Sequence, residues 1–176
     1  DCLLSRGLGD VYKRQVLEDI QEQGELYLKA QGFINYEVSA WRKELPSAHN
    51  LNYWQFGDYL AIGAGAHGKV TQPDGVYRFQ KTRLPKDYLA KVPAEHLQFK
   101  RIEDADMPFE FMMNALRLNQ GVEAKLYAER TGLSLDTLQE LLSSLRDRKL
   151  MVDDQDRLSC TEQGHIFLNS VLEEFL

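Results

Sequence analysis

A glycine-rich stretch at residues 49–69 places the strongest constraint on how this chain can fold. It holds two of the four histidines, one of the two tryptophans and four of the glycines. Its apolar residues 59–62 favour a strand and lead into Gly-Ala-Gly-Ala-His-Gly at residues 63–68. Such a loop leaves main-chain N–H groups open to a flat or anionic ligand. The pattern predicts a strand that ends in a ligand-binding loop, although many tight turns share it.

Upstream of that stretch, the sequence predicts one helix followed by one strand. Residues 16–31 have apolar side chains at helical spacing, and Gly32 is placed to end the helix as a C-cap. The residues near the apolar face are Val16, Ile20, Tyr27 and Leu28. Residues 33–40 are rich in β-prone Phe, Ile, Tyr and Val and predict a strand. Helix, glycine and strand form one step of an α/β sheet or barrel.

The middle of the chain predicts short elements joined by turns. Residues 50–56 predict a short helix capped by the asparagine at its start. Pro-Asp-Gly at residues 73–75 is a β-turn signature, and residues 76–82 return as a strand. A proline opens a short helix at residues 85–91, and residues 96–101 are expected to be extended.

The last part of the sequence becomes mainly helical. Residues 107–119, 123–131 and 134–148 predict three helices, the last with leucines at helical spacing. Residues 150–160 predict a β-hairpin with a polar tip, and residues 161–175 a final helix. A helix, a helix–turn–helix, a two-stranded wing and a helix are typical of a winged-helix-like domain.

The charge of this part argues against DNA binding. Residues 104–176 contain fourteen acidic and seven basic side chains, whereas the rest of the chain is nearly balanced. The recognition helix at residues 134–148 holds three acidic and two basic residues, and the wing tip holds three aspartates. Affinity for DNA comes largely from Lys and Arg at phosphates. We therefore expect no nucleic-acid partner and interpret this domain as a packing or docking module.

Composition bounds the class of protein. The net charge of −6 gives no general attraction to nucleic acid or to anionic membranes. No apolar run approaches the length of a membrane span, so a soluble protein is expected. The two cysteines, Cys2 and Cys160, provide no disulfide framework, which fits a cytoplasmic location.

Seven short strings of the sequence resemble the HemW family of radical-SAM heme chaperones, which is related to oxygen-independent coproporphyrinogen III oxidase. They are YEVSA at 36–40, HNLNYW at 49–54, FGDY at 56–59, IGAGAHGK at 62–69, KTR at 81–83, PFEF at 108–111 and FLNS at 167–170. The resemblance covers roughly residues 16–176 and concerns the C-terminal part of the family's proteins.

The resemblance implies a fold and a division into domains. Residues 16–103 are expected to form the C-terminal portion of a radical-SAM α/β barrel, and residues 104–176 a winged-helix-like C-terminal domain. Residues 1–15, DCLLSRGLGDVYKRQ, have no counterpart in the family and look like translated adapter sequence. We expect them to be a non-native leader on a truncated gene product.

The resemblance also associates the H-N-x-x-Y-W pattern with heme. An imidazole can ligate heme iron axially, and flat aromatic rings suit a porphyrin plane. If the segment is helical, His49 and Tyr53 share one face, and Asn50 and Trp54 share the neighbouring face. These four residues are the candidate heme site, with His49 as the metal ligand. The structural alternative is that His49 and Asn50 make hydrogen bonds while Tyr53 and Trp54 fill the core.

A second candidate site lies in the glycine-rich loop. In radical-SAM relatives this loop is at the rim of the SAM-binding barrel, so the resemblance makes Gly63, Gly65 and His67 candidates for cofactor binding. The alternative is a turn whose histidine bonds a nearby carbonyl. The family's 4Fe-4S cluster needs three cysteines at C-x3-C-x2-C spacing, which two scattered cysteines cannot supply. SAM and the cluster therefore belong to the full-length parent, and this chain is not expected to be catalytic alone.

Three functions remain open from the sequence. The first is a fragment of a heme chaperone that binds heme and delivers it to heme proteins, with a weakly membrane-associated partner also considered. The second is an oxygen-independent coproporphyrinogen III oxidase of porphyrin biosynthesis. The third is a structural docking fragment with no ligand. The H-N-x-x-Y-W pattern favours the chaperone.

Overall fold

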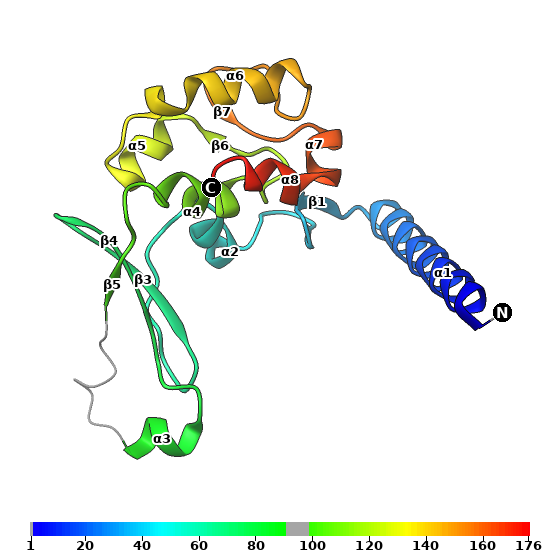
Figure 1. Ribbon diagram of the computed structural model, residues 1–176, viewed down its shortest axis with the longest axis horizontal. Coiled ribbons are helices and arrows are strands. Elements are labelled where there is room, and N and C mark those ends of the chain that lie inside the picture. The colour runs from blue at the N-terminus through cyan, green and yellow to red at the C-terminus, as the bar shows by residue number, and fades with distance from the viewer. Residues whose placement is uncertain (1, 91–98) are drawn as a thin grey trace. The chain divides into compact units, whose positions relative to one another are not determined.

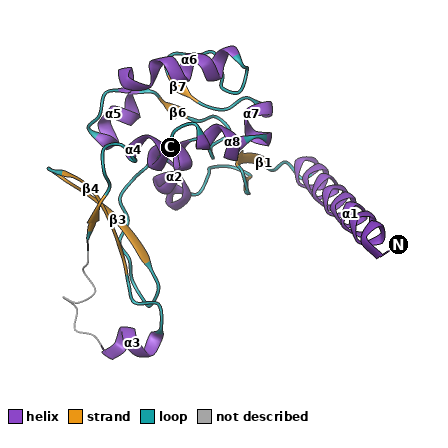
Figure 2. Ribbon diagram, in the orientation of Figure 1, coloured by secondary structure: helices purple, strands orange, loops and turns teal. Residues whose placement is uncertain are grey.

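The computed structural model describes residues 2–90 and 99–176 as a mixed α/β chain with small sheets (Figures 1 and 2). This confirms the expected α/β class. The chain divides into two compact units, one up to Pro46 and one from Ser47 to Leu176. Every pairing between the strands of the described residues is antiparallel.

The first unit begins with the long helix α1 (Cys2–Ala30), which the sequence predicted to start only at residue 16. Helix-forming Leu, Arg, Lys and Gln outnumber the two glycines in its first half. The predicted glycine at its end is confirmed, because Gly32 has a left-handed φ of 79°. Val16, Ile20 and Tyr27 are each more than half exposed, so the predicted apolar face is largely open to solvent.

The first unit continues with a hairpin where the sequence predicted one strand. Strand β1 (Ile34–Glu37) pairs with β2 (Ala40–Arg42). The Asn35 amide donates to the carbonyls of Glu37 and Ala40, and the Glu37 carboxylate accepts from the Ser39 N–H and hydroxyl. These side-chain bonds specify a reversal that the β propensity of residues 33–40 does not reveal.

The second unit opens with a short helix and an antiparallel sheet. The helix is α2 (Ala48–Trp54), and the sheet order is β3 (His67–Gln72), β4 (Gly75–Gln80) and β5 (Lys100–Arg101). The predicted turn at residues 73–75 is confirmed by the register from His67 opposite Gln80 to Gln72 opposite Gly75. Helix α3 (Pro85–Ala90) begins at the predicted proline. Residue 91 of the predicted helix and residues 96–98 of the predicted extended segment lie outside the described residues.

Two predictions in this region are wrong. Residues 59–62 form no strand: Tyr59 makes one bridge with Lys69, and Leu60 and Ile62 are 75% and 85% exposed. The glycine-rich loop therefore leads into β3 instead of following a strand. Helix α2 is capped by Ser47 and not by Asn50, because the Ser47 hydroxyl accepts from the Asn50 N–H.

The rest of the second unit is mainly helical, as predicted. Its elements are α4 (Met107–Ala115), β6 (Val122–Glu123), α5 (Lys125–Thr131), the 3₁₀ helix η2 (Leu135–Leu138), α6 (Gln139–Asp147), β7 (Arg157–Leu158), α7 (Glu162–Ile166) and α8 (Leu168–Glu173). The helix predicted at residues 134–148 divides into η2 and α6, and the last helix divides at Phe167. Residues 150–160 make one bridge, between Met151 and Cys160, while β7 pairs with β6.

Buried aromatic residues join the two parts of the second unit. Phe56, which follows α2, lies 5.5 Å from Phe111 of α4 between ring centroids. Phe111 in turn lies 5.2 Å from Tyr127 of α5, edge to face. All three are at most 1% exposed. This cluster fixes the segment after α2 against the C-terminal helices and so positions the candidate site.

Candidate functional site

Helix α2 contains all the residues of the H-N-x-x-Y-W pattern and is capped at its start by Ser47. The rings of His49 and Tyr53 lie 4.8 Å apart between centroids and are tilted by 57°. They share one face, as their i,i+4 spacing predicted. His49 is exposed, so its imidazole is accessible from solvent.

The ring contacts continue from α2 to the β-sheet. Tyr53 lies 4.2 Å from Tyr59 between ring centroids, tilted by 33°. The backbone of Tyr59 is held by two hydrogen bonds with Lys69, of 2.9 and 3.0 Å. His49, Tyr53 and Tyr59 therefore form a row of three rings, which we call the aromatic row, with one end exposed and the other fixed to β3.

An ion pair supports the fixed end of the aromatic row. The Nη1 atom of Arg78 donates to the Tyr59 hydroxyl at 3.1 Å. The same guanidinium donates through Nε, at 3.0 Å, and through Nη2 to the Glu110 carboxylate on α4. Burial lowers the pKa of Arg78, but the hydrogen bond and charge of Glu110 outweigh this effect and raise it overall.

Trp54 faces the C-terminal helices, whereas His49 is exposed to solvent. The Arg117 guanidinium carbon lies 4.5 Å from the Trp54 ring centroid, in a cation–π contact. The indole N–H of Trp54 is buried and has no hydrogen-bond partner among the described residues. A buried donor without a partner is uncommon.

A second charged pair lies beside the aromatic row. Lys69 is 1% exposed; its Nζ lies 3.1 Å from Oδ1 of Asp58 and 4.1 Å from the Phe56 ring centroid. Burial lowers the pKa of Lys69, and the nearby Asp58 only partly offsets this effect. For Asp58, burial raises the pKa, but hydrogen bonds from the Thr71 N–H and hydroxyl and from Lys69 lower it overall. This pair ties the segment before the glycine-rich loop to β3.

The glycine-rich loop is held by main-chain bonds at its second half. Gly63 and Gly65 have φ angles of 94° and 71°, which L side chains rarely adopt. The Gly65 N–H donates to the Thr82 carbonyl at 2.9 Å. His67 begins β3 opposite Gln80 and is exposed. The structure brings these three candidates into one loop, but it shows no contact between His67 and the aromatic row among the described residues.

Within the described residues, neither His165 nor Cys160 belongs to a further site. Cys160 is 4% exposed, and burial raises its pKa to about 12, so the thiol stays protonated and unreactive at neutral pH. Burial lowers the pKa of His165. His96 lies outside the described residues. Within residues 2–90 and 99–176, no group of three or more His, Cys, Asp or Glu side chains is arranged to hold a metal ion.

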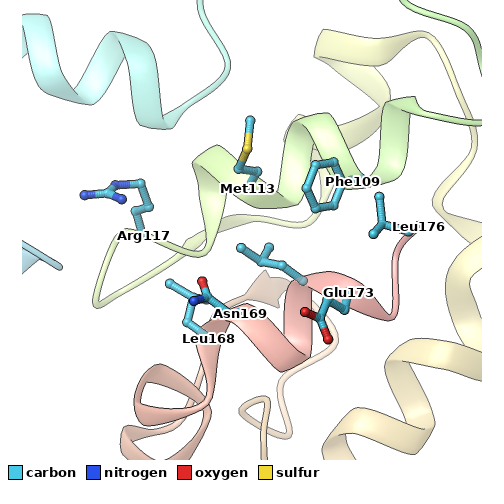
Figure 3. A pocket seen from close by; sticks show the side chains of 8 residues that line it. Phe109, Met113, Arg117, Leu168, Asn169, Glu173 and Leu176 are labelled. Carbon is cyan, nitrogen blue, oxygen red and sulfur yellow. The ribbon is translucent and has the colours of Figure 1, made fainter.

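An apolar groove of about 430 Å³ runs between α4 and α8 (Figure 3). Phe109 and Met113 line it from α4, and Leu168 and Leu172 line it from α8. Arg117, which covers Trp54, stands at one end of the groove (Figure 3). The groove therefore ends next to the residues of α2.

Tyr59, Arg78 and Glu110 are site residues that spacing alone did not reveal. Arg78 follows Tyr59 by 19 positions and precedes Glu110 by 32. Pairs this distant in sequence leave no periodic signal. Tyr59 and Glu110 do lie in two of the strings that carry the family resemblance, FGDY and PFEF, which was the available signal.

None of the helices in the described residues is long and apolar enough to cross a membrane.

Comparisons with known proteins place this chain beside heme chaperones. Residues 102–167 match the HemN C-terminal domain. Over 163 residues, the chain is 44% identical to the heme chaperone HemW of Haemophilus influenzae, covering 91% of this chain and 42% of that protein. The corresponding protein of Escherichia coli is 43% identical over the same shares of the two chains. A mitochondrial radical S-adenosyl methionine domain-containing protein 1 from Dictyostelium discoideum is 25% identical over 90% of this chain and 42% of its own length.

These matches confirm the resemblance that the sequence indicated. The chain spans about two fifths of the length of the curated relatives it matches. No solved structure matches it significantly.

Proposed function

The chain is related to the heme chaperones named HemW, and from that premise we propose that it is part of a radical-SAM-type heme chaperone. Such a protein binds heme and passes it to heme proteins. The observation that carries this proposal is the exposed imidazole of His49 at the end of the aromatic row. An accessible imidazole next to flat rings is the chemistry that heme iron and a porphyrin plane require.

The proposal includes an assignment of domains. Residues 16–103 would be the C-terminal portion of a radical-SAM barrel, and residues 104–176 a winged-helix-like domain. The match of residues 102–167 to the HemN C-terminal domain supports a boundary near residue 103. The element order α4, β6, α5, α6 and β7 supports the winged-helix-like assignment. Residues 1–15 remain proposed as a non-native leader.

The residues of α2 fit heme as cargo. In this proposal the His49 imidazole would coordinate the iron, and Tyr53 and Trp54 would lie against the macrocycle. The amide of Asn50 is a hydrogen-bonding donor on the neighbouring face of α2, whereas the indole N–H of Trp54 is buried. A porphyrin offers carboxylates that such donors bind.

The exposure of His49 suits a carrier that must release its cargo. A ligand deep in a core would need local unfolding before heme could leave, whereas an exposed imidazole can exchange with that of an acceptor protein. Heme-accepting proteins are therefore the proposed partners. A cytoplasmic location and a weakly membrane-associated partner remain proposals as well.

For Gly63, Gly65 and His67 we propose a place at the rim of the SAM-binding barrel of the complete protein. Their support is the left-handed φ of both glycines, which leaves main-chain groups uncovered. The residues of this chain do not fit a 4Fe-4S cluster. Its whole sequence has two cysteines, one of which is the buried Cys160, so the three thiolates would come from the rest of the parent protein.

A hemin titration of the full-length protein, followed by Soret absorbance, tests the proposal. Wild type should show a saturable shift, and His49→Ala should weaken binding by at least about tenfold because it removes the axial ligand. His67→Ala serves as the matched control, an exposed histidine outside the aromatic row, and should bind as wild type does. Absence of a saturable shift in wild type would contradict the proposed function.

A further inference from the structure

Resting on the proposed function, we propose that Tyr59 is a positioning residue for the heme site, held in place by the Arg78–Glu110 ion pair. Tyr59, Arg78 and Glu110 lie outside the H-N-x-x-Y-W pattern. The inference follows from the contacts that link them to His49.

The first step is that α2 alone holds His49 weakly. The helix has seven residues, which is about two turns, and none of them is fully buried, so it has little stability of its own. The imidazole of His49 lies against the ring of Tyr53, with 4.8 Å between the ring centroids. The orientation of His49 therefore depends on what holds the ring of Tyr53.

The second step is that Tyr59 holds Tyr53. Their ring centroids are 4.2 Å apart, closer than the 4.8 Å between His49 and Tyr53. The N–H of Tyr59 donates to the Lys69 carbonyl, and the Tyr59 carbonyl accepts from the Lys69 N–H. The Tyr59 hydroxyl accepts from Arg78. With backbone and side-chain tip both fixed, the ring of Tyr59 has little freedom to tilt.

The third step is that Glu110 fixes Arg78. The carboxylate accepts from both Nε and Nη2, which sets the plane of the guanidinium and directs Nη1 toward the Tyr59 hydroxyl. Glu110 belongs to α4, whose Phe111 is packed against Phe56 and Tyr127 in the core. A rigid core element thus orients an exposed imidazole through one ion pair and two rings.

This arrangement meets a requirement of axial ligation. Binding is strongest when the ligand is already in the productive orientation, because less conformational freedom is lost. Side chains that orient a metal-binding histidine typically change metal affinity by about 10- to 100-fold when they are removed. Tyr59 acts through two ring contacts, so a smaller effect of about three- to tenfold is expected.

The test uses Tyr59→Phe and Glu110→Gln in the full-length protein, with Tyr77→Phe as the matched control. Tyr77 lies on β4, and its hydroxyl donates to Asp74 at 2.7 Å, so the control also loses one hydrogen bond of a tyrosine hydroxyl, but away from the aromatic row. Hemin affinity is measured by Soret titration, and the NMR signals of the His49 ring are recorded in the heme-free protein. Thermal melting establishes that each variant is folded.

The proposal expects both test variants to shift the His49 ring signals and to weaken hemin binding about three- to tenfold. Tyr77→Phe should do neither. If wild type binds hemin through His49 but Tyr59→Phe binds equally well with unchanged His49 signals, the positioning role is wrong and the heme function stands. If wild type binds no hemin but Tyr59→Phe still shifts the His49 signals, the mechanical link stands and the heme function is wrong.

Discussion

At the scale of single residues, the buried Lys69 is the least expected feature of the second unit. A lysine that is 1% exposed is tolerated because Asp58 and the face of Phe56 compensate its charge. Asp58 itself is about half exposed, which screens the attraction. The pair therefore matters mainly because its loss would leave a buried charge unmatched.

We predict that Asp58→Asn lowers the free energy of unfolding at pH 7 by about 1–2 kcal/mol, since it removes the negative charge beside Lys69 and one of the two oxygens, Oδ2, which accepts from the Thr71 N–H. Folding lowers the pKa of Asp58. Its contribution is thus fully present above the ordinary pKa of aspartate and is lost as the pH falls through the lowered folded pKa. Urea unfolding should show the difference from wild type shrinking below about pH 4.

The control for this prediction is Asp153→Asn, at an exposed aspartate of the loop before β7. It should change the free energy of unfolding by less than about 0.5 kcal/mol. A difference between Asp58→Asn and wild type that persists unchanged at pH 3 would show that ionisation of Asp58 is not what stabilises the fold.

The candidate site could be predicted only where its residues are near each other in sequence. The contact of His49 with Tyr53 follows from helical spacing, and the structure has it. The contact of Arg78 with Glu110 joins two elements that are adjacent only after folding. Sequence periodicity does not reveal such a pair. The ion pair that supports the aromatic row could therefore be found only in the folded structure.

At the scale of elements, the start of α7 is fixed by a close approach of two backbones. The Thr161 hydroxyl caps the helix by accepting from the Gly164 N–H at 3.0 Å. A Cβ atom at Gly164 would lie 1.9 Å from the Leu150 carbonyl oxygen. Only glycine lets this helix pack against the segment that follows α6.

We predict that Gly164→Ala destabilises the second unit by about 1–3 kcal/mol, because backbone must move to relieve the overlap. Thermal unfolding should show the lower melting temperature. Gly24→Ala is the matched control, also a helical glycine, but with nothing within 4 Å of the added Cβ. It should leave stability unchanged or raise it by up to about 1 kcal/mol. Equal melting temperatures for the two variants would contradict the packing argument.

Local chemistry explains which elements could be predicted. The turn at residues 73–75 follows from Pro-Asp-Gly itself, and the register of β3 and β4 agrees with it. The glycine-rich stretch was misjudged because residues 59–62 have strand-forming side chains but find no strand partner beyond the bridge at Tyr59. Strand formation depends on the neighbour in the sheet, which sequence periodicity does not specify.

At the scale of the whole molecule, the chain combines a small first unit with a larger unit that holds every candidate site residue. The relatives named as heme chaperones match nine tenths of this chain, and the chain matches about two fifths of them. The proposed division of labour follows from this. In this proposal the chain would supply the imidazole and aromatic rings for heme, and the remainder of the protein would supply the thiolates for a cluster.

The most direct test of the central claim is imidazole rescue of hemin binding in the full-length His49→Gly variant. If His49 is the axial ligand, the variant should lose the Soret band of histidine-ligated heme, and added imidazole should restore it by occupying the space of the missing side chain. Added imidazole should leave the Soret band of the wild type unchanged. A His49→Gly variant whose spectrum and hemin affinity equal those of wild type without imidazole would contradict the account.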